Sequence, residues 1–331
     1  MEDFCHSVLR SSVYEGKKIL ENIISGNYSE VCCKMDGEYD GGGKYDSNGA
    51  SRLLTAQYLL LCGDLSDSIE NVIAKLMKEE ISARHQDAYQ GIGDCIIILT
   101  AMLKKFNSDG KYDELFSLAK NANFDCFCGY DPDSCEKSVC KNISELSSAE
   151  CIYMLADIGQ TEKAAMAAEW YSREYPPKTI PQYKELIYIN KQTGRFKENI
   201  PLYESICTME FENGDNWSIS SVCNDLISEY IRYQMYDKAF EVFCKESECI
   251  LKVEKWYSCG LGRDFLENAA DLIIRLPENA EALWCKWSRF ALIYPDRFGT
   301  NCLNKLIDAA ELVGDRESAE VFGSACRKRK R

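Results

Sequence analysis

The sequence predicts an all-α protein that is built from stacked helical hairpins. Three observations lead to this prediction. Apolar residues recur at three- and four-residue spacing, no run of alternating apolar and polar residues is sustained, and a short polar turn recurs between amphipathic segments. Repetition of one hairpin unit at intervals of about 20 to 50 residues is typical of stacked helical arrays.

Helical periodicity is clearest in the second half of the chain. Cys151, Met154, Leu155 and Ile158 recur with the spacing of one helix face, and the stretch 224–243 has the same pattern. Each such stretch ends at a turn, and a second amphipathic stretch follows it. This order predicts pairs of helices that pack against each other.

The turns have a glycine or a polar residue at their pivot. The pivots are Gly110, Gly159, Gly194, Gln234 and Gly314. The first four are 49, 35 and 40 residues apart, and the last gap of 80 residues would hold about two units. The spacing therefore predicts an imperfect helical repeat.

Aromatic and small residues follow these pivots in a recurring order. Phe196 and Tyr203 follow Gly194, Tyr236, Ala239 and Phe243 follow Gln234, and Ala164 and Pro176 follow Gly159. This pattern resembles a degenerate tetratricopeptide repeat over 145–325 and, more weakly, over 50–125. Asn199 and Gly323 depart from it, because the repeat has a small and a large residue at those places. The resemblance implies an α-solenoid, and a generic bundle of helical hairpins is the alternative.

Composition shifts divide the chain into five segments. We expect an N-terminal helical segment with a Gly/Asp-rich loop (1–50), helical hairpins (51–125), a Cys-rich inter-helix loop (126–144), repeat-like helices (145–325) and a basic tail (326–331). The stretch 176–181, PPKTIP, predicts a short extended linker within the repeat-like helices, since proline ends helices.

The charge of the chain bears on its partners and its location. It has 53 acidic and 39 basic residues and a net charge of −14, which disfavours nucleic acid and favours a basic or extended protein segment. The longest apolar run, 95–103, is about half the length of a membrane span. The first residues lack the basic and apolar blocks of a signal peptide. We therefore expect a cytoplasmic protein that does not enter the membrane.

Four of the 18 cysteines lie within 126–140. Cys126, Cys128, Cys135 and Cys140 would supply the four thiolates of a zinc site, but neither pair has the usual two-residue gap. The favoured interpretation is reduced structural cysteines in an inter-helix loop, and structural zinc or a redox pair is the alternative.

A second candidate metal site lies in the Gly/Asp-rich loop. Asp36, Glu38, Asp40 and Gly41 resemble the opening of a calcium-binding loop. Ser47 stands where a closing glutamate is needed, so the sequence favours a flexible solvated loop without calcium.

The sequence offers little support for catalysis. It has two histidines, of which His6 is expected to be solvated and His85 to lie on a helix surface. We expect no enzyme, but a protein–protein interaction module that acts as a scaffold, adaptor or inhibitor. The alternative is a helical enzyme or metal-dependent sensor with 126–140 as its site.

The resemblance also implies a binding surface. In tetratricopeptide proteins the first helix of each pair lines the groove, at positions about ten, six and three residues before the turn. Counting back from the pivots gives these residues: Tyr153, Lys184, Tyr188, Lys191 and Asn224. Such side chains suit a peptide backbone or an acidic tail. Alternatively, Tyr153 and Tyr188 pack between neighbouring hairpins.

Overall fold

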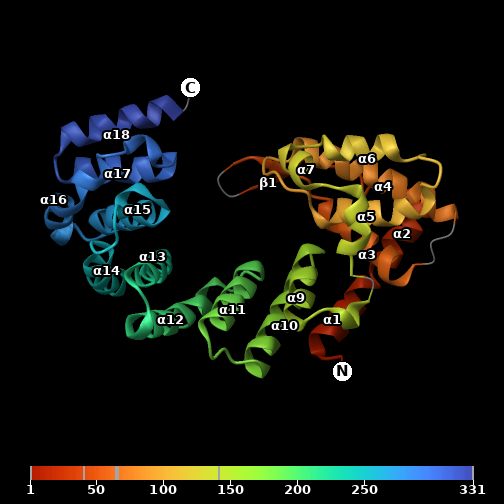
Figure 1. Ribbon diagram of the computed structural model, residues 1–331, viewed down its shortest axis with the longest axis horizontal. Helices are drawn as coiled ribbons and strands as arrows, with labels where there is room; N and C mark the ends of the chain where they lie inside the picture. Colours follow the sequence, from red (N-terminus) through yellow and green to blue (C-terminus); the bar gives the residue numbers. More distant parts are fainter. Residues whose placement is uncertain (1, 40–41, 64–66, 141, 330–331) are drawn as a thin grey trace. The chain divides into compact units, whose positions relative to one another are not determined.

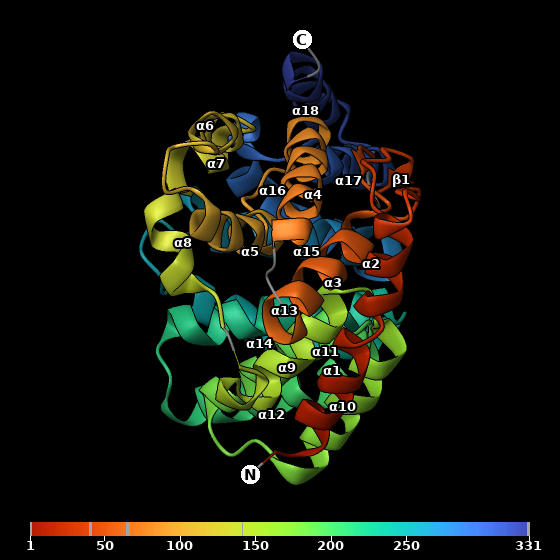
Figure 2. The same ribbon diagram turned by 90° about the vertical axis from the view of Figure 1, so that its right-hand side faces the viewer.

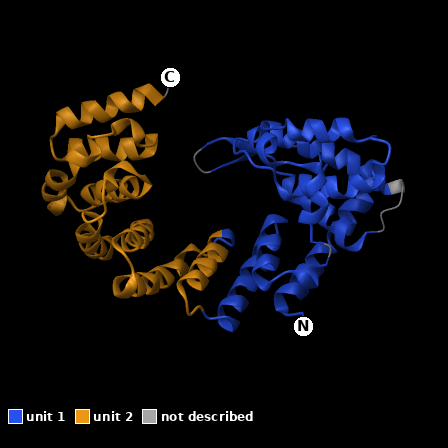
Figure 3. Cartoon of the chain, viewed as in Figure 1, with its two compact units in different colours: residues 1–176, 192–194 blue, residues 177–191, 195–331 orange. Residues whose placement is uncertain are grey.

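The computed structural model describes residues 2–39, 42–63, 67–140 and 142–329. These residues are helical almost throughout, and the only sheet among them is one short antiparallel pair. The predicted all-α class is therefore confirmed. The chain divides into unit 1, residues 1–176 with 192–194, and unit 2, residues 177–191 with 195–331 (Figure 3). Among the described helices, none combines the length and the apolar character that crossing a membrane requires.

Unit 1 holds ten α-helices and one strand pair among its described residues (Figure 1). They are α1 (Phe4–Val13), α2 (Gly16–Ile24), β1 (Gly37–Glu38), β2 (Lys44–Tyr45), α3 (Gly49–Cys62), α4 (Asp67–Gln86), α5 (Asp94–Leu103), η1 (Lys104–Phe106), α6 (Asp113–Lys120), α7 (Phe124–Gly129), α8 (Pro132–Ser138), η2 (Ile143–Glu145), α9 (Ser148–Asp157) and α10 (Thr161–Glu174).

Unit 2 continues the chain with four helical hairpins. Its elements are α11 (Ile180–Gln192), η3 (Phe196–Glu198), α12 (Asn199–Asn213), α13 (Asn216–Arg232), α14 (Tyr236–Ile250), η4 (Trp256–Ser258), α15 (Gly260–Arg275), η5 (Pro277–Asn279), α16 (Ala280–Ala291), η6 (Pro295–Arg297), α17 (Thr300–Leu312) and α18 (Arg316–Arg329). Helix α18 includes the described part of the predicted basic tail, whose residues 330–331 lie outside the described chain.

The predicted pivots are all turns with left-handed backbone. Their φ angles are 78° at Gly110, 77° at Gly159, 72° at Gly194, 59° at Gln234 and 77° at Gly314. After the last four pivots, the next residue donates its N–H to the carbonyl five positions earlier, as in Arg195 to Asn190 at 2.7 Å. This bond closes a helix end when the pivot is left-handed, which explains the preference for glycine.

The core of unit 2 joins successive hairpins. Helix α13 packs against α14 and α15, and α15 packs against α16 and α17. At its centre, the Phe265 ring lies 4.7 Å from the rings of Phe243 and Trp287 and 5.3 Å from that of Trp256. Large buried rings of this kind contribute much of a domain's hydrophobic stabilisation.

Within unit 1, helix α1 packs against the α9–α10 hairpin (Figure 2). His6 Nε2 lies 2.8 Å from the Leu146 carbonyl oxygen, and the Cys5 thiol donates to the Ala167 carbonyl over 3.8 Å. His6 is buried, so the expectation of a solvated His6 is wrong, whereas His85 is exposed on α4 as expected. The α9–α10 hairpin belongs to unit 1, and unit 2 begins at residue 177 within the proline-rich linker.

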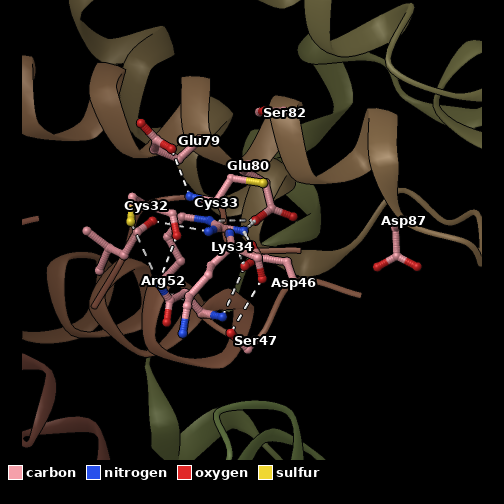
Figure 4. A network of polar contacts seen from close by, with 12 residues as sticks. Cys32, Cys33, Lys34, Asp46, Ser47, Arg52, Glu79, Glu80, Ser82 and Asp87 are labelled. Atoms are coloured by element: carbon pink, nitrogen blue, oxygen red, sulfur yellow. Dashed lines mark hydrogen bonds and ion pairs between the residues drawn. The ribbon is translucent and has the colours of Figure 1, made fainter. Parts of the chain in front are cut away.

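A buried ion network holds the connection between α2 and α3 (Figure 4). The Arg52 side chain is fully buried and donates to Asp46 at 2.5 Å, to Glu80 at 2.8 and 2.9 Å, and to the Val31 carbonyl at 3.1 Å. Asp46 also accepts from the Lys34 backbone N–H at 2.9 Å. The predicted flexible loop is therefore anchored at Asp46, because a buried charge requires its partner.

The segment predicted as a Cys-rich loop instead contains two short helices, α7 and α8. The Asn123 side chain accepts from the Cys126 N–H at 2.8 Å, and Asp131 caps α8, which begins with Pro132. These caps and the proline are helix-start signals. Tyr130, between the helices, is buried and bonds to Thr100 through its hydroxyl at 2.7 Å.

Candidate functional site

The first helices of the hairpins in unit 2 share a hollowed face. Two adjoining cavities lie there, with volumes of about 550 and 470 Å³, and both are lined by Trp217, Ser221 and Asp225 of α13. The larger cavity extends over α15 and α17, and the smaller one over α11 and α12. We call the two cavities together the acidic groove. Its charged lining residues are Glu210, Asp225, Asp264, Glu267, Asp271, Lys184, Arg232 and Lys305.

Two of the carboxylates that line the larger cavity have no partner. Asp225 and Asp264 form no hydrogen bond or ion pair with the residues that the structure describes. Although both residues are exposed, the groove walls displace water from their carboxylates and raise the pKa of each. Asp264 raises the pKa of Asp225 further, and Lys191 and Lys184 oppose this shift. The groove therefore holds negative charge at an electrostatic cost that a cation would relieve.

One basic side chain pairs with two carboxylates in the part of the groove formed by α15 and α17. Lys305 of α17 lies 2.7 Å from Glu267 and 2.8 Å from Asp271, both on α15. Burial nevertheless raises the pKa of Asp271, although its hydrogen bond to Lys305 opposes the shift. Lys305 thus pairs with both of these carboxylates, whereas Asp225 and Asp264 in the same cavity have no such cation.

Trp217 supplies an aromatic surface next to these carboxylates. It is the second residue of α13, it is 48% exposed, and it lines both cavities. An exposed tryptophan within a hollow is typical of binding surfaces, because its large rigid ring packs against a partner at low entropic cost.

The floor of the groove is held by an amide network. Asn224 donates to the Leu261 carbonyl at 3.2 Å, and Asn268 donates to the Asn224 side chain and backbone at 3.1 Å each. Ser228 donates to Asn268 at 3.0 Å. Both asparagines are buried, so their amides join α13 to α15.

The structure places the predicted binding residues in different surroundings. Lys184 lines the smaller cavity, and the exposed Lys191 lies 5.7 Å from the Tyr203 ring. Tyr188 is 52% exposed on the same helix, α11. Asn224 lines the larger cavity, but its amide is engaged by α15. Tyr153 belongs to unit 1, where it lines a separate cavity.

Sequence reasoning missed Trp217, Asp225 and the acidic residues of α15. The turn after α15 contains Pro277 and no glycine, so no pivot marked it. A signal was nevertheless present. The pivots at 194 and 234 are 40 residues apart, and Asp264 lies 40 residues after Asn224. The repeat therefore places the two residues at equivalent positions, and both line the groove.

The four clustered cysteines do not converge on one point. Cys126 and Cys135 are buried, Cys128 is exposed and Cys140 is half-buried. The thiols of Cys126, Cys135 and Cys140 donate to the carbonyls of Gly91, Asp131 and Asn142, at 3.7, 3.2 and 3.0 Å respectively. Burial raises the pKa of Cys135 to about 11, which disfavours the thiolate that zinc binds.

Of the proposed calcium ligands, Asp36 is engaged by neighbouring side chains. Asp36 pairs with Lys34 at 2.7 Å and accepts from the Ser47 hydroxyl at 2.5 Å, while Asp40 and Gly41 lie outside the described residues. Throughout the described chain, no three His, Cys, Asp or Glu side chains are grouped so that they could hold a metal ion.

Comparison of the chain with protein-family models, with curated proteins and with solved structures found no match.

Proposed function

We propose that the protein is a non-enzymatic interaction module that binds an extended basic segment of a partner protein in the acidic groove of unit 2. The partner contact would make it a scaffold, an adaptor or an inhibitor. Four hairpins in series support a tetratricopeptide-like α-solenoid as the architecture of this unit, since stacked hairpins of this kind present their first helices on one concave face.

The main support for this proposal is the pair of carboxylates without a partner, Asp225 and Asp264. Asp225 and Asp264 are partly desolvated and repel each other, so pairing with Lys or Arg relieves a cost that the free protein already bears. Trp217 lines the same cavity, and a bound cation over its ring face would gain about 0.5–2 kcal/mol. The net charge of −14 would also attract a basic partner over longer distances.

The proposal is tested with an unstructured, fluorescently labelled peptide of alternating Lys and Ser, measured by fluorescence anisotropy. We expect the double variant Asp225→Asn and Asp264→Asn to weaken binding at least tenfold, about 1.4 kcal/mol, and Trp217→Ala to do the same. The matched control is Glu212→Gln with Glu248→Gln, which removes two exposed charges on the second helices. Equal affinity of the groove variant and this control would contradict the proposal.

A second variant separates a basic partner from an acidic one. Lys184 and Lys191 partly neutralise Asp225, so replacing Lys184, Tyr188 and Lys191 with Ala removes two positive charges near the groove. For a basic peptide we expect unchanged or tighter binding. If a Glu–Ser peptide binds the unsubstituted protein and this variant weakens that binding at least tenfold, the groove is assigned to an acidic tail.

A further inference from the structure

Unit 1 contains a pocket of its own with a volume of about 290 Å³. Its walls come from α3, α5, α9, residues 138–140 and Leu146. Leu53, Ile98 and Met154 contribute apolar surface from three of these elements. A small, mostly apolar hollow with a few polar groups is the usual form of a small-molecule site.

Two carboxylates meet in this pocket. Asp94 is the first residue of α5, and Asp157 is the last residue of α9. Neither forms a hydrogen bond or ion pair with any residue of the described chain. At the end of α9, Asp157 meets the negative end of the helix dipole, where a positive charge would be favourable. Asp94, at the start of α5, meets the positive end of its helix dipole, so the shortage of positive charge is greatest at Asp157.

A buried amide gives an independent indication of a missing ligand. Gln57 of α3 lines the pocket and is only 5% exposed, yet its Oε1 accepts no hydrogen bond from the described residues. A buried acceptor without a donor costs about 1–3 kcal/mol. A ligand that brings N–H donors would remove this cost.

We propose that the pocket of unit 1 binds a small organic cation that carries an ammonium group on a short apolar chain. The three N–H donors of an ammonium match the three unpartnered acceptors, Asp94, Asp157 and Gln57. The apolar chain packs against Leu53 and Met154. This site is independent of the acidic groove, because all its lining residues belong to unit 1.

The probe is hexylamine, titrated into the full-length protein by calorimetry, with hexan-1-ol and hexanoate as matched ligands that lack the positive charge. We expect hexylamine to bind at least tenfold more tightly than either ligand, a difference of about 1.4 kcal/mol. Asp94→Asn and Asp157→Asn should each weaken hexylamine binding about tenfold, and Gln57→Leu should also weaken it.

Two control variants test whether hexylamine binds in the pocket of unit 1. Asp125→Asn removes an exposed charge on α7 outside the pocket, and Asp225→Asn with Asp264→Asn removes the charges of the acidic groove. Both should leave hexylamine affinity unchanged. Equal binding of hexan-1-ol, loss of binding in the groove variant, or binding of tetralysine without binding of hexylamine would overturn the proposal.

The pH dependence of hexylamine binding gives a further test of the proposed site. The titratable lining residues are Asp94 on α5, Cys140 between α8 and η2, and Glu150, Tyr153 and Asp157 on α9, and α3 contributes none. Desolvation by the pocket walls, followed by the Asp94 charge, raises the pKa of Asp157 to about 6, although the residue is exposed at the pocket mouth. Hexylamine binding should therefore strengthen as the pH rises from about 5 to about 7.5, and this dependence should disappear in Asp157→Asn.

Discussion

Unit 2 and the N-terminal part of unit 1 are stabilised in different ways. In unit 2, left-handed pivots close the helices α11, α13 and α17, so most of the architecture follows from short local rules. In unit 1, the long connection between α2 and α3 has no such repeat, and Arg52 holds it through buried contacts to residues far apart in sequence. A repeated local turn can be recognised in a sequence, whereas a buried ion network is specified only by the packed structure.

The largest expected effect tests the buried network. Replacing Arg52 with Leu leaves the Asp46 and Glu80 carboxylates buried without their cation, and we expect a loss of about 3–5 kcal/mol in the free energy of unfolding of unit 1. Because the chain has two units, the loss should be measured by hydrogen exchange of separate peptides, with faster exchange in α3 and α4 and unchanged exchange in α13 to α18.

The matched control is Lys17→Leu. Lys17 pairs with Glu21 at 3.9 Å on the surface of α2, and exposed pairs of this kind contribute about 0–1 kcal/mol. If Lys17→Leu and Arg52→Leu had the same small effect, the network would not hold the connection in place.

A smaller effect of opposite sign is expected in unit 2. Gln234 has a φ of 59° where three other hairpin turns have glycine, and a side chain in this conformation costs about 1–2 kcal/mol. Gln234→Gly should therefore stabilise unit 2 by about 1 kcal/mol, measured by exchange in α13 and α14. Gly194→Ala, the converse change at a pivot with open space around it, should destabilise by a similar amount. Effects of equal sign in the two variants would mean that the pivots are not equivalent.

The smallest expected effect concerns Asp157. Its folded-state pKa of about 6 lies above the ordinary value of 3.8, so the folded state binds the proton more tightly than the unfolded state. Stability from this group is present below about pH 4 and is lost as the pH rises through about 6. We expect Asp157→Asn to raise the melting temperature at about pH 7.5 relative to the unsubstituted protein, with a smaller difference at about pH 4.5. A difference that is independent of pH would contradict the raised pKa.

The sequence predicted the fold more completely than it predicted the residues of the acidic groove. The pivots, the all-α class and the start of the linker at residue 176 could be predicted because each depends on residues near one another in the chain. The predicted end of the linker at residue 181 was wrong, since α11 begins at Ile180. For the groove, counting from the pivots found Lys184 and Asn224 among the lining residues. It could not show that Asn224 is engaged by Leu261, or that Asp225 and Asp264 lie close enough for their charges to interact.

The sequence by itself determined where helices start, turn and end, since capping side chains and left-handed pivots act over a few residues. It also determined which faces are apolar, through three- and four-residue spacing. Only the tertiary structure decided that α1 packs on α9 and α10, that Arg52 is buried between Asp46 and Glu80, and that Tyr130 is buried with its hydroxyl bonded to Thr100. Each of these depends on the desolvation of groups distant in sequence, and that energy exists only once the chain has packed.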